Sequence, residues 1–183
     1  MAIELLGFHP KAVSDVEGQD FVRRLATGDR DVIAAIYDRY AAGLYRVLAA
    51  VLSSQADAED ALQNVFLALA ERRANRVRNL RAYLYTVARH EAFQMLRRRR
   101  REARVEVVEV AQASREIDGI DWQTLIATLP VEQREVIAMK VYEQMTFEEI
   151  AVIVGVSVNT AASRYRYGIA RLRVALGSED NHG

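Results

Sequence analysis

Cysteine is absent from this chain of 183 residues, and histidine and lysine are scarce. Without cysteine there is no disulfide framework, no thiolate metal site and no thiol nucleophile. The three histidines, His9, His90 and His182, stand singly, and none has a second ligand at metal spacing. We therefore expect no cofactor, no metal site and no redox sensing within the chain.

Long apolar runs are also missing. None approaches the roughly 20 residues that a membrane span requires. The N-terminal stretch from Ile3 to Phe8 is short, is interrupted by Glu4 and lacks the basic region of a signal peptide. We expect a cytoplasmic protein without membrane insertion. There is also no Walker loop and no Gly-x-Ser-x-Gly elbow, so an enzyme is not expected.

With only two prolines, Pro10 and Pro130, and few strand-like alternations, the sequence predicts an all-α protein. We expect two small helical domains joined by a linker, the second containing a helix-turn-helix. The predicted boundaries are a flexible arm over residues 1–19, a first domain over 20–101, a linker over 102–119, a second domain over 120–176 and a tail over 177–183.

Apolar spacing and capping residues predict the individual helices. The first block spans about 20–52 with a turn at Gly28 and Asp29, and helices follow at about 57–73 and 80–101. Valine and glutamate alternate over residues 105–110, which could form a strand or a short helix within the linker. In the second domain we expect a helix over 122–128, one opened by Pro130, and two capped by Thr146 and Ser157.

Charge is segregated along the chain. Residues 72–104 hold twelve arginines and two acids, whereas residues 1–71 and 105–183 each have a net charge of −5. A basic band between acidic flanks is typical of a surface that binds a polyanion, with flanks that meet a different partner. An ordinary solvated helix face rich in arginine is the alternative.

Aromatic residues are interleaved with arginines in this basic band. Rings that stack unpaired bases, beside cations that follow phosphates, are the combination that binds single-stranded nucleic acid. Helical aromatic residues are also common in cores, and we expect at least one of Tyr83 and Phe93 to be packed inside. The candidate contacts are Arg76, Arg78, Arg81, Tyr85, Arg89, Arg97 and Arg98.

The segment from Thr146 to Tyr167 has the pattern of a helix-turn-helix. Small residues stand where two helices would cross, at Ala151 and Ala161, and Gly155 suits a turn with positive φ. A helical hairpin with a glycine C-cap is the plainer alternative. Short polar and guanidinium side chains would point outward into a major groove, from Ser157, Asn159, Thr160, Ser163, Arg164 and Arg166.

The helix predicted over 57–73 has a polar face that includes an exposed leucine. Asp60, Gln63 and Asn64 share this face with Leu67. A lone exposed leucine carries little meaning, but next to a basic loop this stripe suggests a docking surface for another protein.

Five stretches together resemble the bacterial extracytoplasmic-function sigma factors. They are DAEDALQNVFL at 57–67, NLRAYLYTVAR at 79–89, LPVEQREV at 129–136, FEEIA at 147–151 and GVSV at 155–158. The resemblance covers about residues 20–176, in the order and at the spacing of the family.

This resemblance implies an initiation subunit of RNA polymerase that is not itself an enzyme. Asp60, Gln63, Asn64 and Leu67 would face the core polymerase. The loop from Ala74 to Asn79, with the face of Arg81, Tyr85 and Arg89, would hold a displaced strand of the minus-ten element. The helix that begins at Ser157 would read the minus-thirty-five element. Core RNA polymerase and promoter DNA are the implied partners, and an anti-sigma factor is a further candidate partner.

The chain departs from the usual family pattern at several positions. Asn64, His90 and Gln94 replace the common Glu, Asn and Asp, and Ala161 with Ala162 replaces a common Val-Lys pair. The missing lysine suggests an unusual upstream promoter sequence. Two other functions stay open: a stand-alone helix-turn-helix regulator, and a sigma-like adaptor that binds polymerase without directing initiation.

Overall fold

The computed structural model describes residues 24, 27, 29–71, 79–105 and 122–177 of the chain. The predicted N-terminal arm, most of the predicted linker and all but the first residue of the C-terminal tail lie outside the described residues. So do two of the candidate nucleic-acid contacts, Arg76 and Arg78.

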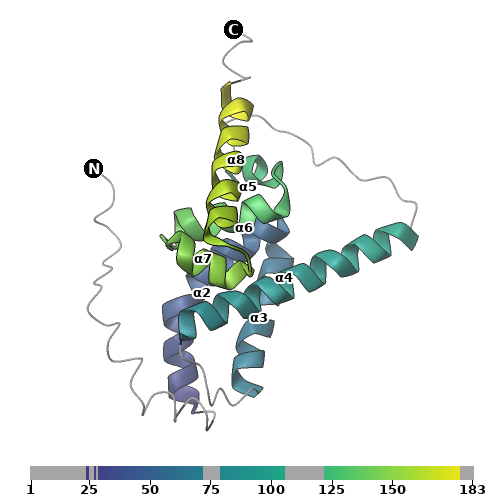
Figure 1. The fold of residues 1–183 in the computed structure, drawn as a ribbon. Coiled ribbons are helices and arrows are strands. Elements are labelled where there is room, and N and C mark those ends of the chain that lie inside the picture. Colours follow the sequence, from purple (N-terminus) through teal and green to yellow (C-terminus); the bar gives the residue numbers. More distant parts are fainter. Residues whose placement is uncertain (1–23, 25–26, 28, 72–78, 106–121, 178–183) are drawn as a thin grey trace.

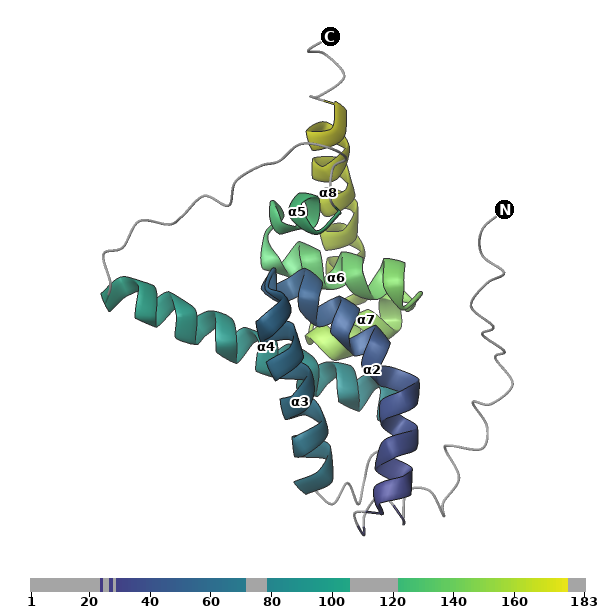
Figure 2. The same ribbon diagram turned by 180° about the vertical axis from the view of Figure 1, so that it is seen from behind.

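Three long helices form the first half of the described structure: α2 (Arg30–Leu52), α3 (Gln55–Glu71) and α4 (Leu80–Val105). Helix α2 begins after Asp29, whose side chain accepts a hydrogen bond from the amide of Asp31. Gly28, the other residue of the predicted turn, lies outside the described residues. Helices α2 and α3 lie side by side and are joined through Ser53 in the left-handed region (Figure 2).

Helix α4 is longer than the sequence pattern indicated, because it continues past Arg101 to Val105. An ion pair of 2.8 Å between Arg98 and Glu102, one turn apart, supports this extension. The first residues of the predicted linker are therefore helical. The C-terminal half of α4 projects from the body of the molecule in both views (Figures 1 and 2).

Four shorter helices form the second half: α5 (Trp122–Ala127), α6 (Val131–Tyr142), α7 (Phe147–Val154) and α8 (Val158–Gly177). Pro130 precedes the first residue of α6, as predicted. Thr146 forms a capping box with Glu149, and Gly155 ends α7 with φ of 71°. The hydroxyl of Ser157 accepts a hydrogen bond of 3.1 Å from the amide of Thr160, which confirms the predicted cap of α8.

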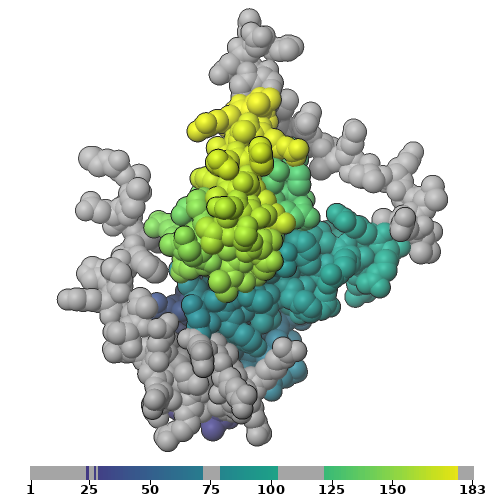
Figure 3. All heavy atoms as spheres, viewed as in Figure 1, coloured from purple at the N-terminus to yellow at the C-terminus, as the bar shows by residue number. Residues whose placement is uncertain are grey.

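The two halves pack directly against each other, chiefly through α2 with α6 and α4 with α7. In Figure 3 the atoms of the second half lie on α4 over its N-terminal portion. At one end of this contact Arg134 of α6 donates hydrogen bonds to the carbonyl of Val51 and to Ser53. Buried apolar residues of both halves form one continuous core.

The all-α prediction with two helical groups is confirmed across the described residues. The direct packing of the two groups is a tertiary feature that the helix pattern did not indicate. None of the described helices is both long enough and apolar enough to span a membrane.

Candidate nucleic-acid interface

Helices α7 and α8 cross in a helix-turn-helix. Ala151 and Ala161 are both buried where the helices meet, and Gly155 supplies the left-handed turn between them. Tyr165 packs its ring edge-on against Phe147, with 5.6 Å between ring centroids. The crossing therefore has the small residues and positive φ that this motif requires.

The N-terminal part of α8 presents short polar side chains to solvent. Asn159 and Thr160 are exposed in the first turn. One turn further, Arg166 is exposed and donates a hydrogen bond of 3.2 Å to Ser163. Arg164 is different, because only 27% of its side chain is exposed and it points toward Glu135 of α6.

The start of α4 is held against α7 and the turn that precedes it. Asn79 caps α4, since its side-chain oxygen accepts a hydrogen bond of 2.9 Å from the amide of Ala82. Arg81 donates to the backbone carbonyl of Glu143 and lies 3.5 Å from the carboxylate of Glu149. In this conformation Asn79 and Arg81, both candidate DNA contacts, therefore make their polar contacts within the protein.

Tyr85 is buried, with 1% of its surface exposed. Its hydroxyl lies in a narrow space shared with Gly43 of α2 and the carboxylate of Glu143. Burial raises the pKa of the Tyr85 phenol above its usual value of 10.0, and the charge of Glu143 raises it further. The ring that the sequence assigned to a base-stacking face is therefore buried, with its hydroxyl between α2 of the first half and Glu143 of the second.

Glu135 is the one fully buried charged residue among the described residues. It lies on α6 between two arginines, with Arg89 Nε of α4 at 2.7 Å and Arg164 Nη1 of α8 at 3.5 Å. The guanidinium of Arg89 also stacks over the ring of Phe93 at 4.4 Å. One carboxylate thus joins an arginine from each of the two candidate nucleic-acid elements.

Two opposing effects act on the pKa of Glu135: its burial and its contacts with arginines. Loss of water raises the pKa of Glu135 above its usual value of 4.5, while the hydrogen bond and charge of Arg89 and the charge of Arg164 lower it. The net direction is upward. The two arginines therefore offset only part of the desolvation cost of this carboxylate.

A second acidic residue, Glu143, lies at the same contact between the halves. Only 13% of its side chain is exposed, and its carboxylate is 3.0 Å from Arg46 of α2. Arg81 of α4 approaches the same carboxylate at 4.0 Å. The acids of the second half therefore pair with bases of the first half at more than one point.

The C-terminal part of α4 is open to solvent. Arg97 and Arg98 are both exposed, and Arg98 pairs with Glu102 on the same helix. Arg99 instead reaches Asp57 at the start of α3. This end of α4 is a basic surface to which the second half of the chain makes no hydrogen bond or ion pair within the described residues.

The predicted docking face on α3 is exposed as the sequence indicated. Asp60, Gln63 and Asn64 point to solvent, and 57% of Leu67 is exposed. The apolar residues at 58, 61, 62, 65, 66 and 69 are buried on the opposite side against α2 and α4.

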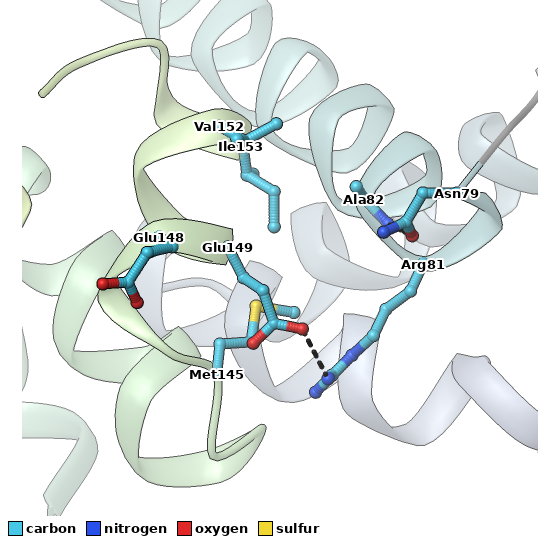
Figure 4. Close-up of a pocket in the computed structure, with 8 residues that line it drawn as sticks. All are labelled: Asn79, Arg81, Ala82, Met145, Glu148, Glu149, Val152 and Ile153. Atoms are coloured by element: carbon cyan, nitrogen blue, oxygen red, sulfur yellow. Dashed lines mark hydrogen bonds and ion pairs between the residues drawn. The ribbon is translucent and has the colours of Figure 1, made fainter. Parts of the chain in front are cut away.

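A pocket of about 220 Å³ opens between the start of α4 and α7 (Figure 4). The ion pair of Arg81 and Glu149 crosses its rim, and Met145 and Ile153 supply apolar walls. The pocket lies at the contact between the two halves of the molecule, and the residues that line it include no cluster of reactive side chains.

Sequence reasoning missed the acids that contact the basic helix. Glu135, Glu143 and Glu149 all come from the acidic C-terminal third, which the charge pattern assigned to a separate partner. The segregation of charge was the available signal, because an acidic segment can neutralise a basic one within the same chain. Which acid meets which arginine depends on the packing of α6 and α7 on α4.

Each half of the described structure matches a known family model. Residues 36–102 match the family model of sigma-70 region 2, and residues 120–172 match that of sigma-70 region 4. The first match covers α3 and most of α2 and α4, and the second contains the helix-turn-helix. The chain belongs to the sigma-70 family of RNA polymerase sigma factors.

Curated relatives agree with this assignment over most of the chain. The sigma factor SigL of Mycobacterium tuberculosis is 28% identical over 167 residues, which cover 82% of this chain and 92% of SigL. SigK of Mycolicibacterium vanbaalenii is 28% identical over 171 residues, with 85% and 87% covered. Both are described as extracytoplasmic-function RNA polymerase sigma factors.

Two solved structures share the fold. The sigma factor RpoE of Bartonella quintana, crystallised with the anti-sigma factor NepR, is 25% identical with a TM-score of 0.65, over 79% of this chain and 96% of RpoE. CnrH, solved with the cytosolic domain of CnrY, has a TM-score of 0.66 at 20% identity, over 86% and 95%. The likeness to CnrH concerns the fold alone.

Proposed function

We propose that this sigma factor directs promoter recognition through three surfaces: the exposed face of α3, the basic helix α4 and the N-terminal part of α8. It supplies no chemistry of its own and acts in the cytoplasm with core RNA polymerase. The observation that carries this proposal is the pairing of a region 2 segment with a region 4 helix-turn-helix in one chain.

In this proposal α3 binds the core enzyme. Asp60, Gln63, Asn64 and Leu67 form one exposed stripe with an apolar centre and a polar rim. That composition suits a protein interface, where an apolar contact is surrounded by groups that stay hydrated.

Helix α4 and the loop before it hold the displaced strand of the minus-ten element. Arginines follow the phosphates, and the aromatic residues stack unpaired bases, each stacked base contributing about 1–3 kcal/mol. Unstacking costs a few kcal/mol, so these contacts act together with the polymerase. Tyr85, Arg81 and Arg89 can take part only after the second half of the chain moves off α4.

Helix α8 enters the major groove of the minus-thirty-five element. Asn159, Thr160, Ser163 and Arg166 offer short polar groups and a guanidinium to base edges and phosphates. Ala161 is fully buried, so the alanine at that position affects packing and makes no base contact. Ala162 is half-buried, and the proposed change in promoter preference falls on this position.

An anti-sigma factor is a further proposed partner, because RpoE of Bartonella quintana was crystallised with one. The test of the proposed function is reconstitution with bacterial core polymerase, followed by sequencing of transcripts started on a random-promoter library. Initiation from a defined pair of elements is the expected result. Polymerase binding without initiation would favour the adaptor, and no binding would favour a stand-alone regulator.

A further inference from the structure

Lys140 lies in the last turn of α6, beside the helix-turn-helix. Its ammonium donates a hydrogen bond of 2.8 Å to the backbone carbonyl of Met145. The same nitrogen lies over the ring of Phe147, 4.9 Å from its centre, where a cation is attracted to the aromatic face. One side chain therefore contacts both the turn after α6 and the first residue of α7.

The turn that Lys140 contacts has a strained backbone. Gln144 lies in the left-handed region with φ of 52°, although it carries a side chain. Met145, the next residue, is fully buried, and its amide donates a hydrogen bond of 3.3 Å to the carbonyl of Met139. Lys140 satisfies the carbonyl of the same residue. Such a conformation persists only where its surroundings fix it, so the two bonds of Met145 hold the turn in place.

Phe147 connects this turn to helix α8. Its ring packs edge-on against Tyr165 with 5.6 Å between centroids, and both rings are partly buried against the core. Because a helix turns by about 100° per residue, Tyr165 lies about 200° around α8 from Ser163, on the side opposite the polar face. The aromatic pair therefore supports the back of α8, and a displacement of Phe147 moves the face that is proposed to contact DNA.

The contacts of Lys140 go beyond those of an ordinary helix end. A lysine in the last turn interacts favourably with the negative end of its own helix, and that effect needs neither a ring nor a neighbouring helix. Here the ammonium also has two directed contacts outside α6. Helices α6, α7 and α8 all contact one another (Figure 1). The side chain is thus placed to act on their relative orientation as well as on stability.

We propose that Lys140 is a positioning residue, which acts through Phe147 and Tyr165 to set the orientation of α8 relative to α7. This orientation decides which bases of the minus-thirty-five element α8 reaches. The inference rests on the proposed function for the identity of the ligand, duplex promoter DNA. The coupling among the three side chains does not depend on that function, and all three belong to the second half of the chain.

Fluorine NMR measures the coupling on the free protein. The chain is produced with 3-fluorotyrosine, and the variant Tyr165→Phe identifies the resonance of Tyr165 among the eight tyrosines. Lys140→Met keeps an unbranched side chain but removes the ammonium, so it should shift this resonance. Lys140→Arg keeps a cation and a donor and should leave the resonance close to its wild-type position. An unmoved resonance in Lys140→Met would overturn the coupling.

Promoter preference is measured with core polymerase on the promoter selected from the random library and on its single-base variants. Lys140→Met should reduce the discrimination among minus-thirty-five variants by about fivefold, the lower end of the effect of one base contact. Discrimination among minus-ten variants should stay unchanged. Lys140→Arg should retain the wild-type preference at both elements. Wild-type discrimination at the minus-thirty-five element in Lys140→Met would overturn the positioning role.

Thr146→Ala is the matched control for a loss of stability at the same turn. It removes the side-chain cap of α7 and leaves Lys140 and Phe147 in place. A loss of stability lowers initiation on all promoter variants alike, and Thr146→Ala should have only this effect. An equal loss of minus-thirty-five discrimination in Thr146→Ala would assign the effect of Lys140→Met to stability and overturn the inference. Circular dichroism shows whether each variant remains helical.

A double variant tests the route through the aromatic ring. Phe147→Leu removes the ring that lies between Lys140 and Tyr165. In this background Lys140→Met should have little further effect on minus-thirty-five discrimination, because the effects of residues in one chain of contacts are not additive. Fully additive effects would show that Lys140 does not act through Phe147 and would overturn the proposed route.

Transcription by the wild type separates this inference from the proposed function. If the wild type initiates at defined elements while Lys140→Met keeps the wild-type discrimination, the positioning role is wrong and the function stands. If the wild type does not initiate while the Tyr165 resonance shifts in Lys140→Met but not in Lys140→Arg, the function is wrong and the coupling of Lys140 to α8 stands.

Discussion

Gly43 is the residue at which α2 meets the turn after α6. A Cβ at this position would lie 2.6 Å from both carboxylate oxygens of Glu143 and 2.6 Å from the hydroxyl of Tyr85. These distances are shorter than real Cβ contacts, so a side chain at this position would force Glu143 or Tyr85 to shift. The helix tolerates Gly43 although glycine costs about 1 kcal/mol relative to alanine inside a helix.

Gly43→Ala should destabilise the protein by up to about 2 kcal/mol, because overpacking typically costs about 1–3 kcal/mol and the helix recovers about 1 kcal/mol of propensity. Urea unfolding followed by circular dichroism gives this value. Gly168→Ala is the matched control, since a Cβ there would meet Ile137 inside the second half. Only Gly43→Ala should also reduce energy transfer between dyes attached at Ala70→Cys on α3 and Ala170→Cys on α8. A Gly43→Ala variant that is more stable than the wild type, or that keeps the full energy transfer, would contradict this prediction.

At the scale of elements, the start of helix α7 shows how residues a few positions apart set the boundary of a helix. Thr146 and Glu149 satisfy each other's backbone amides at the start of α7, with hydrogen bonds of 3.2 and 2.7 Å. The same Glu149 lies 3.5 Å from Arg81, so one side chain serves both a local cap and the contact between the halves.

Thr146→Ala should lower the free energy of unfolding by about 0.5–2 kcal/mol, because it removes the side-chain cap of α7. Denaturant unfolding measures the change. Thr86→Ala serves as the control: that hydroxyl is exposed and bonds within its own helix to the carbonyl of Ala82, and surface changes of this kind stay within about 0.5 kcal/mol. Equal costs in the two variants would argue against the capping box as the source.

On helix α8, Arg166→Ala should reduce promoter-specific transcription and leave the affinity for core polymerase unchanged. A lost base or phosphate contact of this type costs about 1–3 kcal/mol, so a reduction of about tenfold or more is expected in reconstituted initiation. Arg173→Ala, an exposed arginine further along the same helix, is the control. Normal transcription by Arg166→Ala would show that the recognition surface lies elsewhere.

On helix α3, Leu67→Asp should weaken binding to core polymerase by roughly tenfold or more, because it places a charge at the apolar centre of the proposed interface. Affinity is measured by fluorescence with labelled sigma factor. Glu59→Ala, on an exposed flank of the same helix, should bind normally. An unchanged affinity for Leu67→Asp would remove α3 as the docking face.

At the scale of the whole molecule, one core runs through both halves and a set of ion pairs crosses between them. A shared core makes unfolding cooperative across the halves. Glu135→Lys puts a third cation beside Arg89 and Arg164 and should separate the halves, each with its own smaller core. The packing of the two halves can therefore be tested by the number of unfolding transitions, without DNA or polymerase.

Calorimetry should record a single transition for the wild type, with equal calorimetric and van't Hoff enthalpies, and two transitions or a broadened one for Glu135→Lys. Glu132→Lys should retain the single transition. Two transitions in the wild type would mean that the halves unfold independently and that the contact between them contributes little coupling.

Much of this protein could be predicted from local sequence. Apolar spacing predicted α3 and the start of α4 to within two residues, and Pro130, Thr146, Gly155 and Ser157 marked the boundaries of the second half, because capping and helix packing depend on residues a few positions apart. The exposed stripe on α3 followed from the same periodicity. The C-terminal end of α4 was predicted too early, because a run of arginines is compatible with a helix and with a loop.

The sequence by itself therefore determined the helices, the helix-turn-helix and the band of positive charge, all of which arise from neighbouring residues. The tertiary structure alone decided that Tyr85 is buried, that Glu135 lies between Arg89 and Arg164, and that Gly43 lies against the side chains of Glu143 and Tyr85. Arg89 and Glu135 are 46 positions apart in the sequence, and Arg46 and Glu143, which also pair between the halves, are 97 apart. Helical periodicity holds no information on such pairs, because they form only when two independently patterned surfaces come together.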